Sequence, residues 1–143
     1  MPIFVPEMNN TRFATAIHIL TLLANFPDEW LSSDWIAGSI NINPVIVRKE
    51  LSMLQNAGLV TSRKGKEGGS KLNKPSHGIS LAEIYLSVKN SEVLGKKNLS
   101  PNPQCPVGKD INENLDKLFA ETDQWVIDSL RHKTLKDFVK QFR

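Results

Sequence analysis

The stretch from residue 43 to residue 75 constrains the fold more than any other part of this sequence. It begins with Asn43 and Pro44, and proline suits the first turn of a helix because an N–H there would have no partner. Three apolar residues then recur at helical spacing before Gly58: Val47, Leu51 and Leu54. The basic, glycine-rich segment SRKGKEGGSKLNKP follows at residues 62–75. This order predicts a helix that stops at a glycine and leads into a small two-stranded hairpin.

Two further helices are predicted ahead of this unit. Residues 11–26 carry apolar side chains at helical spacing, and SSDWIAGSI, residues 32–40, starts with serines that can cap a helix. Three helices followed by a hairpin are the element order of a winged helix-turn-helix. The fold class that we predict is therefore mainly α, with a small β-hairpin as the wing and a long helix near the C-terminus.

The second half of the chain has a different pattern. A short helix is predicted over residues 80–88, followed by a stretch with three prolines and no periodicity, which indicates a long loop. A long amphipathic helix then begins at residue 110. We expect three parts: a winged helix-turn-helix DNA-binding domain at residues 1–90, a loop with Cys105 at 91–109, and a dimerisation helix with a C-terminal tail at 110–143.

The long helix carries its apolar residues on one side: Ile111, Leu115, Leu118, Phe119, Val126 and Leu130. This stripe can pack within the chain or against an identical partner. The position of the helix after a long loop favours the partner, since dimerisation buries the stripe and doubles the number of helix-turn-helix units. We therefore expect a homodimer with these residues at its interface.

Charge is unevenly distributed along the sequence. The net charge is only +3, but residues 44–75 hold seven Lys and Arg against two Glu, a local +5, whereas residues 1–43 have a local charge of −3. A basic segment within a nearly balanced chain indicates a localised anionic partner. The pattern of a P-loop is missing from the glycine-rich segment, and the segment is too short and too closely flanked by predicted elements for a linker.

DNA fits this arrangement of charge. A helix can enter the major groove with its first turns against base edges, and the first turns of the predicted third helix hold Asn43, Val45, Arg48 and Lys49. The hairpin would lie beside the groove with basic residues for phosphates: Arg63, Lys64, Lys66 and Lys71. Gly68 and Gly69 let the backbone come close, so that their N–H groups can also bind phosphate. The alternative for these residues is an ordinary solvated surface.

Several motifs resemble the Rrf2 family of bacterial winged-helix regulators, which includes IscR, NsrR and CymR. They are TRFATAIHILTLLA near the start, SxxIAxSIxxNPVxVRKxLxxLxxAGLV over residues 33–60, GKEGG in the wing, ISLAEIY, CPVG and TLKDF. The resemblance covers nearly the full length. It implies a homodimer on a pseudo-palindromic operator of double-stranded DNA, and we expect a repressor rather than an activator. By position it adds Arg12, Ser33 and Pro44 to the DNA-contact candidates named above.

The cysteine content separates this chain from the cluster-binding members of that family. Those members are similar to one another in having three cysteines in the loop before the long helix. Here Cys105 is the one cysteine in the 143 residues. A cluster normally needs four protein ligands, and the three histidines are distant in sequence, so we expect no iron–sulfur cluster and no metal site. The CPVG motif resembles the branch without clusters, some of whose members sense oxidants or electrophiles through one thiol. Cys105 is thus either a sensor, with Lys109 and the next helix start lowering its pKa, or inert.

Other classes of function find little support in the sequence. No nucleophile–base pair, paired carboxylates or metal-ligand spacing indicates an enzyme. No signal peptide or membrane span is predicted, which makes the cytoplasm the expected location. We expect Trp30, Trp35 and Trp125 to pack in the core or at the dimer interface. The alternative function is a protein-interaction module that uses the winged-helix fold and binds DNA only weakly.

Overall fold

The computed structural model describes residues 11–90 and 92–142 and contains the predicted elements in the predicted order. Three helices, α2 (Arg12–Asn25), α3 (Ser33–Ile40) and α4 (Pro44–Asn56), precede the strands β1 (Val60–Arg63) and β2 (Gly69–Leu72). The short 3₁₀ helix η1 (Ser76–Gly78) leads to α5 (Leu81–Val88), and after a long loop come α6 (Ile111–Arg131) and α7 (Leu135–Val139). The predicted fold class is confirmed. Residues 1–10 of the predicted first domain lie outside the described residues.

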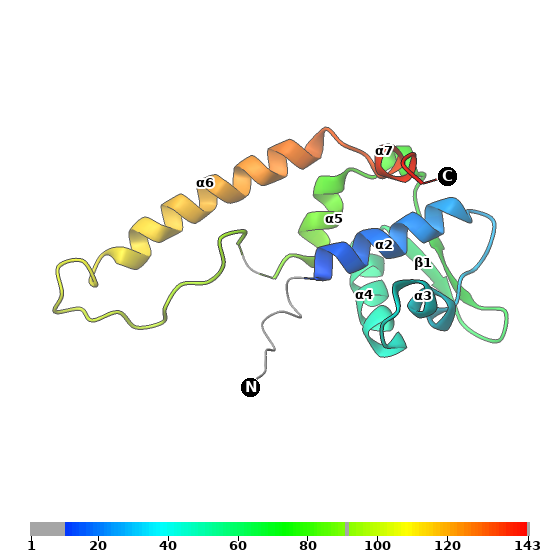
Figure 1. The fold of residues 1–143 in the computed structure, drawn as a ribbon, viewed down its shortest axis with the longest axis horizontal. Coiled ribbons are helices and arrows are strands. Elements are labelled where there is room, and N and C mark those ends of the chain that lie inside the picture. Colours follow the sequence, from blue (N-terminus) through cyan, green and yellow to red (C-terminus); the bar gives the residue numbers. More distant parts are fainter. Residues whose placement is uncertain (1–10, 91, 143) are drawn as a thin grey trace.

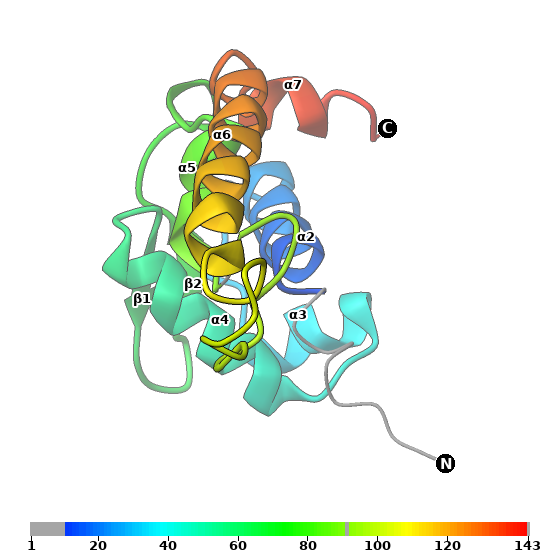
Figure 2. The same ribbon diagram turned by 90° about the vertical axis from the view of Figure 1, so that its left-hand side faces the viewer.

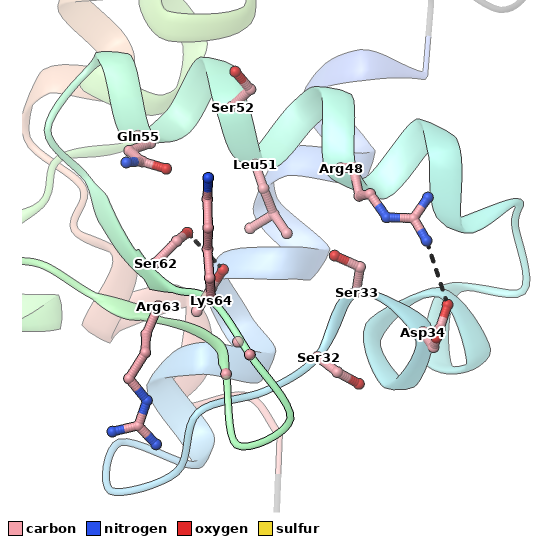
Figure 3. A pocket seen from close by; sticks show the side chains of 14 residues that line it. Ser32, Ser33, Asp34, Arg48, Leu51, Ser52, Gln55, Ser62, Arg63 and Lys64 are labelled. Carbon is pink, nitrogen blue, oxygen red and sulfur yellow. Dashed lines mark hydrogen bonds and ion pairs between the residues drawn. The ribbon is translucent and has the colours of Figure 1, made fainter.

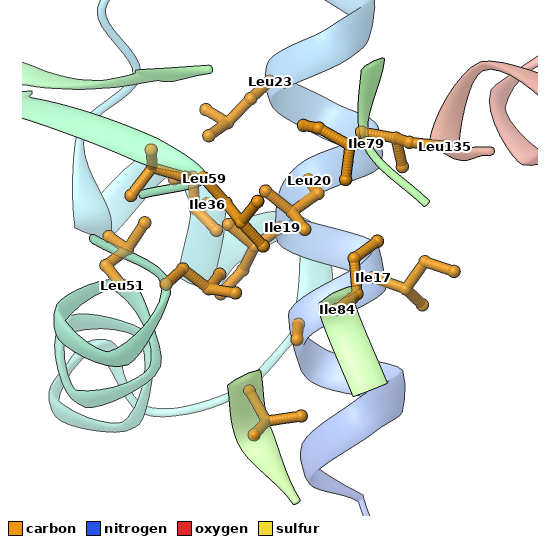
Figure 4. Close-up of a cluster of buried hydrophobic side chains, with 14 of the residues drawn as sticks. Ile17, Ile19, Leu20, Leu23, Ile36, Leu51, Leu59, Ile79, Ile84 and Leu135 are labelled. Atoms are coloured by element: carbon orange, nitrogen blue, oxygen red, sulfur yellow. The ribbon is translucent and has the colours of Figure 1, made fainter. Parts of the chain in front are cut away.

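The core forms around α2, which is apolar over most of its surface. Its residues Ile19 and Leu20 are fully buried, and the neighbouring elements add Ile36, Leu54 and Ile84. Figure 4 shows Ile36 and Ile84 meeting Ile19 and Leu20 of the central helix from neighbouring segments. Burying a side chain of this size contributes roughly 1.5–3 kcal/mol, so this cluster fixes the helix-turn-helix in place.

The ends of the helices follow from their capping residues. Ser32 caps α3, because its Oγ accepts the Trp35 N–H at 3.1 Å. Ser80 and Glu83 form a reciprocal capping box at the start of α5. Gly58, with φ of 80°, adopts the left-handed conformation that terminates α4, and it turns the chain toward β1.

Two features join the C-terminal segment to the rest of the fold. α6 packs against α5. The N-terminal end of α6 and the loop that precedes it project beyond the rest of the fold, residues 11–88, which we call the head (Figures 1 and 2). α7 returns to the head, where Leu135 is fully buried and its N–H donates to the Ile79 carbonyl at 2.9 Å. The C-terminal residues that the sequence groups with the long helix therefore complete the core of the head.

Candidate nucleic-acid interface

The first turn of α4 is fixed by residues that the sequence identified. The Asn43 side chain caps the helix, with Oδ1 accepting the Val45 N–H at 2.8 Å, and Pro44 occupies the first turn. The preceding turn depends on Asn41, whose φ of 67° is left-handed. Because Val47 is fully buried on one side of α4, the other side faces solvent, and Val45 is 62% exposed. An exposed valine beside exposed cations is suited to contacting base edges.

A groove lies between α4, the start of α3 and the hairpin, which we call the wing (residues 60–72) (Figure 3). Its volume is about 490 Å³. Arg48 lies on its α4 side and forms an exposed ion pair with Asp34 at 3.7 Å. Lys64 of the wing points toward α4 in Figure 3. The structure thus brings six of the predicted contact residues to one groove: Ser33, Arg48, Arg63, Lys64, Gly68 and Gly69.

Six polar residues that line this groove were not among the predicted contact residues: Ser32, Asp34, Ser52, Gln55, Ser62 and Ser70. Ser52 and Gln55 follow Arg48 at intervals of four and three residues, so they continue the same face of α4. Their spacing was the available signal. Lys49 is exposed on α4 but does not line the groove.

The wing has its shape because of its glycines. β1 and β2 pair antiparallel, with Arg63 opposite Gly69. A Cβ on Gly68 would lie 2.2 Å from the Arg63 carbonyl oxygen, so no larger residue fits this turn. The Gly68 N–H donates to the Gly65 carbonyl at 2.9 Å, which corrects the expectation that this N–H is available to a phosphate.

Arg12 lies away from the groove. Its Nε donates to the Glu50 carboxylate at 3.1 Å, and the two side chains are only 18% and 5% exposed. The pair joins α2 to α4. Arg12 therefore has a structural partner inside the protein, which the sequence analysis did not foresee.

The tryptophans are not core residues. Trp35 is 47% exposed and packs edge-to-face on Phe26, and Trp125 on α6 is 68% exposed. Trp30 is half-buried beside the wing, where Arg63 and Lys71 lie over its ring. The expectation was packing in the core or at the dimer interface: the core alternative is wrong, because all three side chains are half-buried or exposed, and the dimer interface stays a prediction.

The apolar stripe of α6 is divided between the head and the surface. Leu130 packs against the core, whereas Leu118 is 47% exposed, and the other four residues of the predicted interface are half-buried. Asp123 is the buried residue of this helix, and it holds α6 to α5 through the hydroxyl of Tyr85 at 3.1 Å and the ammonium of Lys89. An exposed apolar face therefore remains on α6 in the single chain.

Comparison with known proteins decides the family. The Rrf2 family, described as an iron-dependent transcriptional regulator, matches residues 9–141. The chain belongs to the Rrf2 family. Within it, the Bacillus subtilis protein named "Putative HTH-type transcriptional regulator YwnA" is 45% identical over 130 residues, which span 91% of this chain and 96% of YwnA.

Solved structures agree with this membership of the Rrf2 family. The crystal structure of "a putative DNA binding protein" shares 41% identity with a TM-score of 0.71, covering 89% of this chain and 97% of that one. CymR, the global cysteine regulator of B. subtilis, has the same fold, with a TM-score of 0.63, 19% identity and coverage of 100% and 99%. The winged-helix regulator architecture is thereby shown.

The residues of this Rrf2 member do not fit an iron–sulfur cluster. Cys105 is the single cysteine of the sequence, and a cluster takes four ligands, mostly thiolates. Within residues 11–90 and 92–142, no three His, Cys, Asp or Glu side chains are grouped to hold a metal ion.

The described helices also include none that is long and apolar enough to cross a membrane.

The surroundings of Cys105 were predicted only in part. Its thiol is exposed in the loop before α6, and its pKa is lowered by hydrogen bonds from the backbone N–H groups of Gly108 and Val107. The expected causes were Lys109 and the helix start, whereas the cause is the turn of the loop itself. A lowered pKa raises the fraction of reactive thiolate.

Proposed function

We propose that this protein is a homodimeric repressor that binds double-stranded DNA at a pseudo-palindromic operator. The observation that carries the proposal is the groove between α4 and the wing. Arg48 of α4 and Lys64 of the wing line this groove, and the first turn of α4 is exposed. In this proposal α4 enters the major groove, with Val45, Arg48 and Lys49 toward base edges. The wing contacts the phosphate backbone and fixes the orientation of α4. Bound at an operator, the protein prevents transcription by occupying the site.

The dimer in this proposal forms through α6. Its exposed Leu118 and Trp125 would be covered by the partner, together with the half-buried Ile111, Leu115, Phe119 and Val126. Two copies then present two α4 helices to successive half-sites. No iron–sulfur cluster takes part, since the ligand set for one is missing from the sequence.

The wing supplies a test of DNA binding. Lys64→Ala is expected to weaken binding about equally on every duplex, because a phosphate contact is independent of sequence. The slope of log K against log salt should become shallower by about 0.9 for each phosphate that the variant no longer neutralises. Fluorescence anisotropy over a salt series measures both quantities. Lys136→Ala, an exposed lysine on α7, is the matched control and should leave the slope unchanged. Weaker binding to one operator sequence alone would show that the wing reads bases.

Cys105 is the proposed sensor of oxidants or electrophiles, because its thiol is exposed and its pKa is lowered. The wild-type protein should lose DNA affinity after treatment with peroxide or an alkylating agent, and Cys105→Ser should retain it. Anisotropy before and after treatment gives the comparison. Equal responses of the two proteins would assign the sensing elsewhere or exclude it.

A further inference from the structure

Trp30 contacts both strands of the wing through charged side chains. The Arg63 guanidinium carbon lies 4.5 Å from the centroid of the Trp30 ring, and the Lys71 ammonium lies 5.0 Å from it. Both distances are within the roughly 6 Å over which a cation is attracted to the ring face. We call these three residues the Trp30 cluster. Two cations from different strands are thus held on one aromatic side chain.

The register of the hairpin explains how the cluster forms. Lys71 pairs with Thr61 and Arg63 pairs with Gly69, so both cations lie on the same face of the two strands. Gly69 adds no side chain to that face. A Cβ at this position would lie 2.6 Å from the Leu31 carbonyl oxygen, so the glycine allows the segment after α2 to approach the wing.

Backbone hydrogen bonds fix that segment. The Leu31 N–H donates to the Ser70 carbonyl at 3.1 Å, and the Ser70 N–H donates to the Leu31 carbonyl at 2.9 Å. Leu31 and Ser70 are both buried. Trp30 is therefore held beside the wing by its neighbour in the chain, independently of the two cations.

Glu29 and Glu67 line a pocket together with Trp30 and Arg63, but among the described residues neither carboxylate forms an ion pair with a cation of the cluster. Neither Arg63 nor Lys71 forms an ion pair with any other carboxylate in the described part of the chain. Arg63 donates instead to the backbone carbonyl of Glu67, with Nη2 at 2.7 Å. Two like charges on one ring repel each other, and an anion placed between them removes that repulsion. The cluster thus has the chemistry of a phosphate site.

Arg63 of the cluster also lines the groove already described, but its guanidinium is directed to the other side of the wing from Lys64. In Figure 3, Lys64 is directed toward α4, whereas Arg63, the adjacent residue, is directed away from α4. The two residues can therefore contact different parts of a nucleic-acid backbone.

We propose that Trp30 is a positioning residue that holds Arg63 and Lys71 as one site for a backbone phosphate flanking the DNA segment at α4. This inference rests on the proposed function, since it assigns the residues that hold part of its DNA. The contact is independent of sequence, so it adds affinity without changing which operator is chosen.

The test compares Trp30→Ala with Trp30→Phe on a labelled duplex of roughly 30 base pairs, long enough for two half-sites and their flanks. Trp30→Ala should weaken binding about tenfold at low salt and make the slope of log K against log salt shallower by about 1 to 2. Trp30→Phe keeps an aromatic face and should stay within about twofold of the wild type. Trp35→Ala, which removes an indole that no cation of the described residues covers, should leave the slope unchanged.

The double variant Arg63→Ala/Lys71→Ala keeps the inference testable should Trp30→Ala unfold. It should reproduce the shallower slope, and adding Trp30→Ala to it should cause no further decrease in affinity. A folded Trp30→Ala with the wild-type slope, or a double variant with that slope, overturns the inference and leaves the proposed function standing. A wild type whose duplex binding does not depend on salt overturns both.

Discussion

Replacing Arg12 with alanine is expected to lower the free energy of unfolding by about 3–5 kcal/mol, the usual loss when one member of a buried ion pair is removed. The reason is Glu50, which is 4% exposed and would keep a buried charge without its partner. The other oxygen of this carboxylate already lacks a hydrogen-bond partner within the described residues. Urea unfolding followed by circular dichroism measures the change.

The matched variants separate the structural role of this ion pair from a role in DNA binding. Arg12→Met/Glu50→Met replaces both charges by apolar side chains and should be closer to the wild type than Arg12→Ala, because no buried charge is left unpaired. The family resemblance placed Arg12 among the DNA-contact candidates. An Arg12→Ala protein with wild-type stability and weakened phosphate binding would restore that role and contradict the structural one.

Asp123→Ala is expected to have the second large effect, a decrease of about 3 kcal/mol in the free energy of unfolding. Asp123 is 5% exposed and accepts from the Val93 N–H at 2.9 Å as well as from Tyr85 and Lys89. Lys89 is 23% exposed and can regain some water, so the estimate lies at the low end of the range for buried pairs. Because these contacts join α6 to α5, the variant should also weaken the proposed dimer.

The free energy of unfolding should depend on pH in the acid range because of the Asp123 carboxylate. Burial of Asp123 opposes its charge, but hydrogen bonds from Lys89, the Val93 N–H and Tyr85 outweigh burial, and the pKa of Asp123 is lowered. A carboxyl with a lowered pKa stabilises the folded state above the unfolded pKa, about 3.9, and this contribution disappears as the pH falls through the folded pKa. Asp123→Asn should remove this acid-dependent part. The pKa of Tyr85 is raised to about 12 by burial and by Asp123, so its contribution is lost only in strong alkali.

Unfolding curves at several pH values, with light scattering for the oligomeric state, test the role of Asp123. The control is Asp128→Asn, an exposed carboxylate on α6 that accepts from Gln124 and Arg131 of the same helix at the surface. If Asp123→Ala unfolds like the wild type and dimerises as well, the buried network is not what positions α6.

The order of elements could be predicted because local signals agreed with the fold. α4 begins at Pro44 and ends just before Gly58, and the basic glycine-rich segment forms the hairpin that the sequence predicts. The exposed first turn of α4 likewise followed from the spacing of Val47, Leu51 and Leu54 on the opposite side.

Contacts between side chains that are distant in the sequence could not be predicted from it. Arg12 and Glu50 are 38 residues apart, and no local pattern shows that they meet. Trp30 pairs with cations of the wing because Leu31 bridges to Ser70, a contact set by tertiary packing. The return of α7 into the core also depends on Leu135 meeting Ile79 after the whole length of α6. Amphipathic periodicity gives the buried face of a helix but not the partner that covers it.

Footprinting on genomic fragments selected by the purified protein tests most directly whether a dimer of this chain reads DNA through α4. The account predicts one enriched sequence with two protected half-sites related by approximate two-fold symmetry. Their centres should lie about 10–10.5 base pairs apart, or a multiple of that. Protection without symmetry, or no fragment that competes better than random DNA, would contradict the account and favour a protein-interaction module with weak DNA binding.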